Sequence, residues 1–244
     1  MLGFVFNITS TGLPQNMKND VCSSSAYQVK SSLLLIFFVV LIFLPASQAF
    51  AQVSFKILDQ QGNPVMNSVI STDNTGASTT VSSMAVMDQV NQQFLPHVLV
   101  IQKNQSVDFP NSDAIRHHIY SFSAPKPFEI RLFKGKESSP MQFDKPGVVV
   151  LGCNIHDQMV GYIYIAEDEM TAVTDKNGLA TLATSNQEYY IWHPRLSASN
   201  ADRIKYTLNG DKRAIQKINL SLLPDKKKML KSKFGGRKFS SGGE

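Results

Sequence analysis

The most informative stretch of this sequence reads Cys153-Asn154-Ile155-His156-Asp157-Gln158-Met159. It places a thiol, an imidazole and a thioether at positions i, i+3 and i+6. The apolar runs Val148–Leu151 and Tyr162–Ile165 flank it, and each is typical of a short strand. Because a loop between two strands can turn its side chains toward one point, the stretch predicts a metal site on a β-scaffold.

The donor types favour copper. Two strong donors, a thiolate and an imidazole, together with a weak axial thioether and a second imidazole make the His₂Cys(Met) set of blue copper. The second imidazole must come from elsewhere, and the candidates are His117 and His118, at the start of a predicted strand. Strand neighbours point to opposite faces of a sheet, so only one of the two can be a ligand.

Three other interpretations compete with copper. Zinc binds Cys and His readily, but a thioether is a poor zinc ligand, so Met159 favours copper. Cys153 could instead be a buried apolar side chain and His156 a surface residue. A catalytic cysteine with His156 or His117 as its base would need a third, orienting group, which the sequence does not reveal. We therefore predict that the chain is not an enzyme.

The body of the chain predicts an all-β fold. Short alternating or apolar runs recur between Gly, Pro, Asn and Asp, which is typical of a β-sandwich or barrel. Beyond the first 51 residues we find no convincing helical period. The predicted strands include Val53–Leu58, Val98–Gln102, Ser106–Phe109, His118–Phe122, Val148–Leu151 and Tyr162–Ile165.

Residues 1–51 form a predicted leader. An unbroken apolar run from Leu33 to Leu44 follows Lys30 and precedes Ala49-Phe50-Ala51, which gives the three parts of a secretory signal peptide at about residues 30–51. The run is shorter than the ~20 residues that span a bilayer, so a membrane anchor is the less favoured alternative. We expect a periplasmic mature chain without a stable membrane span.

Removal of the leader leaves one cysteine. Cys22 would be lost with it, so Cys153 could form no intramolecular disulfide. A lone thiol in an oxidising compartment is protected when it is buried or bound to a metal.

The formal net charge of +5 is concentrated at one end. Residues 225–244 contain seven Lys and Arg and two acidic residues, whereas the body is close to neutral. We interpret 225–244 as a basic, disordered tail and predict no nucleic-acid partner.

The spacing Cys-x-x-His-x-x-Met resembles that of the cupredoxins, the type 1 blue-copper family, in their plastocyanin and amicyanin branch. The run Met159–Ile165 is similar to the final strand of that family, and Phe143–Gly147 to the segment before its cysteine. In the family an Asn lies six residues before the first ligand His, and from Asn111 this offset selects His117. The family usually has Asn directly after this ligand, where this chain has His118.

The resemblance implies a Greek-key cupredoxin β-sandwich over residues 81–167. The flanks, 52–80 and 168–224, carry short motifs that resemble a transthyretin-like or carboxypeptidase-regulatory-like β-sandwich, into which the first domain would be inserted or to which it would be joined. These motifs are Gly62-Asn63-Pro64-Val65 and Thr174-Asp175-Lys176-Asn177-Gly178.

The resemblance also implies the function. The chain would bind one type 1 copper ion through His117, Cys153, His156 and Met159 and transfer single electrons in the periplasm, as in bacterial methylamine-utilisation-type cupredoxins. Its partners would be redox proteins such as a c-type cytochrome or a periplasmic oxidoreductase, with His156 as the electron port. The alternative is a copper store or chaperone, or a cell-envelope binding module without electron transfer.

Overall fold

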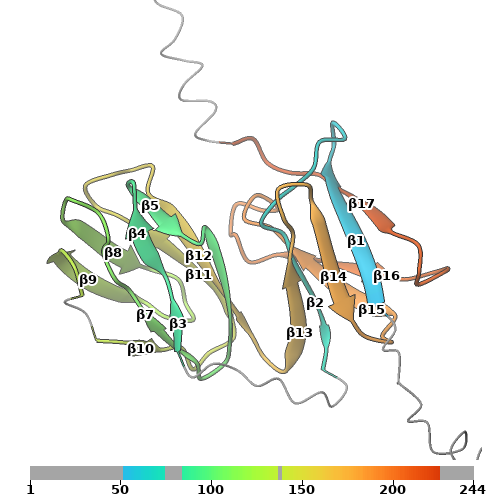
Figure 1. The fold of residues 1–244 in the computed structure, drawn as a ribbon, viewed down its shortest axis with the longest axis horizontal. Coiled ribbons are helices and arrows are strands. Elements are labelled where there is room, and N and C mark those ends of the chain that lie inside the picture. Colours follow the sequence, from blue (N-terminus) through green and yellow to red (C-terminus); the bar gives the residue numbers. More distant parts are fainter. Residues whose placement is uncertain (1–51, 75–83, 137–138, 226–244) are drawn as a thin grey trace, which may run out of the picture. The chain divides into compact units, whose positions relative to one another are not determined.

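The computed structural model describes residues 52–74, 84–136 and 139–225. Within these residues the chain forms seventeen strands and no helix (Figure 1). The predicted all-β fold class is thus confirmed. No helix that could cross a membrane occurs in the described ranges. The predicted signal peptide lies outside them, as does the tail after Asp225.

Two sheets enclose the first core. One has the order β14-β1-β17 and the other β13-β2-β15-β16. Alternate residues along β1 are fully buried, namely Val53, Phe55 and Ile57. The Phe55 ring packs edge-on against the Tyr189 ring, with 4.8 Å between the ring centroids. The strands are β1 (Gln52–Asp59), β2 (Val69–Asp73), β13 (Glu169–Val173), β14 (Leu179–Ala183), β15 (Glu188–Trp192), β16 (Arg203–Thr207) and β17 (Gln216–Leu220).

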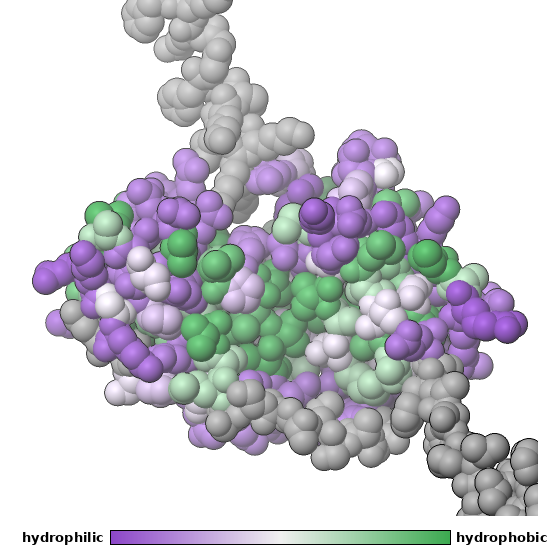
Figure 2. Space-filling view, viewed as in Figure 1, coloured by the Kyte–Doolittle hydropathy of each residue, from purple (hydrophilic) through white to green (hydrophobic). Residues whose placement is uncertain are grey.

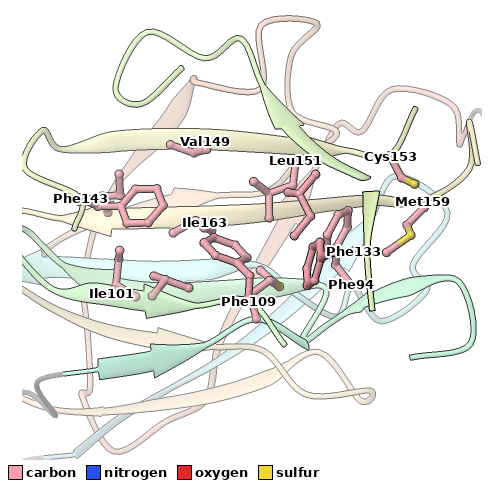
Figure 3. Packing of buried hydrophobic residues seen from close by; sticks show 14 residues of the cluster. Phe94, Ile101, Phe109, Phe133, Phe143, Val149, Leu151, Cys153, Met159 and Ile163 are labelled. Atoms are coloured by element: carbon pink, nitrogen blue, oxygen red, sulfur yellow. The ribbon is translucent and has the colours of Figure 1, made fainter. Parts of the chain in front are cut away.

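A five-stranded sheet of order β6-β12-β11-β8-β9 supports the second core, together with a three-stranded sheet of order β10-β7-β3 and the β4-β5 ribbon. Figure 3 shows the core that they enclose, with Phe109 and Phe143 among its aromatic side chains. The strands are β3 (Met84–Val86), β4 (Asp88–Val90), β5 (Gln93–Leu95), β6 (Val98–Gln102), β7 (Ser106–Asp108), β8 (His117–Ser121), β9 (Phe128–Phe133), β10 (Met141–Gln142), β11 (Gly147–Gly152) and β12 (Val160–Ala166).

Strand β12 is buried on both faces. It pairs antiparallel with β11 and parallel with β6. Because successive side chains of a strand point to opposite faces, Ile163 and Ile165 enter the second core. Tyr164 and Ala166 point the other way and join a separate cluster with Trp192.

This separate cluster also contains polar groups. The Tyr164 hydroxyl donates to Glu169 Oε2 at 3.0 Å and accepts from Arg203 Nη1 at 3.0 Å. Arg203 also forms an ion pair with Glu169. Burial is the main reason that the pKa of Tyr164 is raised. These bonds satisfy a buried hydroxyl that would otherwise destabilise the contact between β12 and β16.

Apolar side chains also reach the surface of the described residues. On the face in view in Figure 2, green, apolar groups gather across the middle and purple, hydrophilic groups lie around them. Much of the accessible surface of any folded protein is contributed by apolar atoms. Phe122 is 87% exposed, and its ring lies 5.3 Å from that of Tyr120.

A buried histidine predicts a loss of stability in acid. His193 is 7% exposed, and burial, helped by the charges of Arg195 and His97, lowers its pKa from 6.5 to about 4. Between these two values the unfolded chain binds a proton that the folded chain does not. Stability contributed by neutral His193 is therefore lost as pH falls from 6.5 through 4, by up to about 3 kcal/mol.

Urea unfolding at several pH values between 7 and 4 measures this loss, with His193→Asn as the comparison. In the parent protein, His193 Nδ1 accepts a hydrogen bond from the Arg195 backbone N–H at 3.1 Å. The His193→Asn variant also has a side-chain acceptor for this N–H. We expect the free energy of unfolding to fall less steeply with acidification in the variant. Equal slopes for the two proteins would contradict the assignment to His193.

Candidate metal centre

The loop 153–159 connects two neighbouring strands of the five-stranded sheet. It leaves β11 at Gly152 and enters β12 at Val160, and these two residues are paired across the strands. The Met159 backbone N–H donates to the His156 carbonyl at 2.8 Å, which closes the loop into a tight turn. The turn explains how three side chains spaced by three residues can face one side.

Glycines border the loop because the backbone is crowded there. A Cβ on Gly152 would lie 2.6 Å from the Tyr120 ring, and one on Gly161 would lie 2.7 Å from Phe94 Cβ. Neither distance is compatible with a side chain without movement of the aromatic neighbour. The two glycines therefore allow β8 and β5 to approach the strands that carry the loop.

Three of the four residues predicted as metal ligands place their donor atoms together. Cys153 Sγ lies 3.9 Å from His117 Nδ1 and 3.8 Å from His156 Nδ1. All three donor atoms lie within 4.8 Å of one another. His117 and Cys153 are buried, whereas His156 is partly exposed. The structure thus forms a His/Cys/His group with one edge toward solvent.

Met159, the fourth predicted ligand, lies at the same end of the core. It is 1% exposed and belongs to the buried cluster that also contains Cys153. Figure 3 shows both sulfur-bearing side chains beside each other at this end, beyond Leu151 and Phe133. A thioether therefore lies at the same end of the core as the Cys153 thiol.

His118 lies outside the group. Its Nε2 atom contacts Glu129 Oε1 at 2.9 Å, on the opposite face of β8 from His117. The following residue, Ile119, returns to the core, and the pairing of β8 with β9 is irregular between His117 and Ile119. Strand alternation separates the two histidines, as expected for neighbours in a sheet.

Asn111 shapes the approach to His117. Its side chain donates to the carbonyls of Ile115 at 3.0 Å and Phe133 at 2.8 Å, and accepts from the Asp113 backbone N–H at 3.0 Å. Asn111 is 3% exposed. The six-residue offset used to select His117 therefore corresponds to a physical role, because this amide fixes the turn that leads into β8.

Asp113 contacts the candidate ligand directly, and the sequence did not predict this contact. Its Oδ2 atom lies 2.7 Å from His117 Nε2. Burial tends to raise the pKa of Asp113, but hydrogen bonds from the Gln92 backbone N–H and from His117 outweigh it and lower the pKa. The only available signal was that Asp113 precedes His117 by four residues.

The size and chemistry of the group fit a transition metal. Cys and His donors bound at about 2.0–2.3 Å to one ion lie about 3.5 Å apart at tetrahedral angles. The observed separations of 3.8 and 3.9 Å need to contract by only a few tenths of an ångström. Two imidazoles, a thiol and a nearby thioether form the soft donor set that suits copper.

Comparison with known proteins gives partial structural likenesses. No family model matches the chain, and neither does any curated protein. Among solved structures, a Cu-containing nitrite reductase from Thermus scotoductus SA-01 matches at 30% identity with a TM-score of 0.32. The match covers 34% of this chain and only 22% of the reductase.

Two smaller proteins match over almost their whole length. A point mutant of amicyanin in the reduced Cu(I) form is 16% identical, with 39% of this chain and 98% of that chain covered and a TM-score of 0.32. A purple cupredoxin from Nitrosopumilus maritimus is 20% identical, with 35% and 100% covered and a TM-score of 0.30. The similar structures thus include cupredoxins, and each likeness is confined to part of the chain.

Proposed function

We propose that this chain binds one copper ion through His117, Cys153, His156 and Met159 and carries single electrons between redox proteins of the periplasm. The convergence of His117 Nδ1, Cys153 Sγ and His156 Nδ1 carries the proposal. Copper bound there supplies a one-electron couple of type 1 character. A carrier of this kind transforms no substrate, so we propose no enzymatic activity.

The surrounding structure suits fast electron exchange. His117 begins a strand and is fully buried, Cys153 follows a strand, and Met159 precedes one. Packing on these strands leaves the donor atoms little freedom to move when the charge of the metal changes. A small structural change between the two oxidation states keeps the barrier to electron transfer low.

Exchange with a partner is proposed to occur at His156. This side chain is partly exposed, and its neighbour Ile155 is 50% exposed. An imidazole edge beside an apolar side chain suits a small, transient contact, as is usual for redox encounters. A c-type cytochrome or a periplasmic oxidoreductase is the class of partner that we propose.

Copper loading of the chain from Gln52 onward tests the proposal, with His117→Ala and His118→Ala as a matched pair. We expect the parent protein and His118→Ala to show an intense visible thiolate-to-copper absorption, one copper per chain and reversible one-electron reduction by a c-type cytochrome. His117→Ala is expected to lose most of that absorption, because it removes one of two imidazole donors.

A colourless protein that binds zinc tightly and copper no better would refute the copper proposal. Equal losses in the two alanine variants would refute the choice of His117. Copper that is bound and handed to an acceptor protein without redox cycling would instead favour a store or chaperone.

A further inference from the structure

We infer that Asp113 is a positioning residue that fixes the ring of His117 as the Nε2–H tautomer, with Nδ1 free to bind metal, and thereby lowers the reduction potential of the site. The part of this inference that concerns the potential rests on the proposed copper function. The part that concerns the ring of His117 does not.

The Asp113 carboxylate is held in place before any metal binds. Its Oδ1 atom accepts from the Asn91 backbone N–H at 2.9 Å, and Oδ2 accepts from the Gln92 backbone N–H at 2.7 Å. Asn91 and Gln92 connect β4 to β5 and have φ values of 52° and 57°. Positive φ at both positions of a two-residue hairpin turn is typical of type I′. This turn directs both N–H groups at one carboxylate.

The carboxylate in turn decides which nitrogen of His117 carries hydrogen. An ionised carboxylate only accepts hydrogen bonds, so Nε2 at 2.7 Å must be the donor. In the neutral ring Nδ1 then has the lone pair, and it faces Cys153 Sγ at 3.9 Å. His117 is fully buried and the Asp113 side chain is 14% exposed, so water competes little for this bond.

A negative charge behind a ligand also affects the metal. A carboxylate that accepts from the distal nitrogen of a histidine makes that histidine a stronger donor, and losing such a partner typically costs about 10–100-fold in metal affinity. Cu(II) carries more positive charge than Cu(I), so Asp113 should favour Cu(II) more. Removal of the carboxylate charge should therefore raise the reduction potential.

A neighbouring carboxylate–imidazole pair, between His118 of β8 and Glu129 of β9, provides a control. His118 Nε2 contacts Glu129 Oε1 at 2.9 Å, but neither residue lies in the His/Cys/His group. Glu129→Gln thus removes a comparable carboxylate–imidazole contact without touching the candidate ligands. Asp113→Asn makes the same chemical change behind His117.

Two measurements test the inference. In the copper-loaded protein, we expect Asp113→Asn to lower the preference for Cu(II) over Cu(I) by about tenfold, which corresponds to a rise of about 59 mV in the reduction potential. Glu129→Gln is expected to leave the potential unchanged. In the metal-free parent protein at mildly alkaline pH, ¹⁵N chemical shifts should show His117 as the Nε2–H tautomer.

The outcomes separate this inference from the proposed function. An Nδ1–H tautomer in the parent protein overturns the inference without any variant, even if Asp113→Asn does not fold. Potentials that rise equally in both variants, or in neither, also overturn it, although the copper proposal stands. A parent protein that binds no copper refutes the proposed function, and the tautomer then still decides the role of Asp113 toward His117.

Discussion

Replacing Cys153 with serine is expected to abolish the intense visible absorption of the copper-loaded protein. In the proposed copper site the absorption would arise from charge transfer between thiolate and copper, and a serine hydroxyl stays protonated where a thiol readily loses its proton. Cys153 is the only cysteine in the described residues, so no other thiol there could replace it. Visible absorption and paramagnetic resonance during a copper titration measure the loss.

Met159→Leu is the matched control for Cys153→Ser. It also removes a sulfur atom from this end of the core, but it keeps the apolar volume. Because an axial thioether binds weakly, we expect the variant to keep the intense absorption and change mainly the reduction potential. A Cys153→Ser protein that is folded and still coloured would show that the absorption comes from another site.

Replacing Trp192 with alanine is expected to lower the free energy of unfolding by about 3–5 kcal/mol. The ring is fully buried and packs against Tyr162 and Tyr164 at centroid distances of 5.9 and 5.6 Å. Its Nε1–H donates to the Asn200 carbonyl at 2.7 Å. The substitution removes the largest side chain of this cluster and leaves that carbonyl without its donor.

Urea unfolding measures the effect, with Phe122→Ala as the matched control. Phe122 is 87% exposed and its ring lies 5.3 Å from the Tyr120 ring, so its truncation should lower the free energy of unfolding by about 1 kcal/mol at most, well below the loss in Trp192→Ala. A similar small change in Trp192→Ala would contradict the packing role. Retention of the copper absorption in folded Trp192→Ala is expected, because the tryptophan is outside the His/Cys/His group.

Much of the strand arrangement could be predicted from local sequence patterns. The prediction Val98–Gln102 coincides with β6, and Tyr162–Ile165 lies within β12. The prediction His118–Phe122 is displaced by one residue from β8, which contains His117–Ser121. Apolar alternation locates a strand well, but the irregular pairing near His117 depends on the neighbouring strand and leaves no local pattern.

The candidate site, too, could be predicted only in part from local sequence patterns. One short loop contains Cys153, His156 and Met159, so their spacing alone predicted that these residues lie close together. The contact between Asp113 and His117 requires the turn at Asn91 and Gln92 to reach across from another part of the chain. Such a contact depends on how the strands pack, which no local spacing encodes.

The double burial of β12 has a consequence for how the metal loop can change in length. If the strand slipped by one residue, Ile163 and Ile165 would exchange places with Tyr164 and Ala166. Side chains of the wrong shape would then fill both the second core and the cluster around Trp192. Insertions between Cys153 and Met159 must therefore bulge outward as extra loop. The strand that follows the loop is fixed in register. Only the solvent-facing part of the loop can therefore vary in length and change the spacing of the candidate ligands.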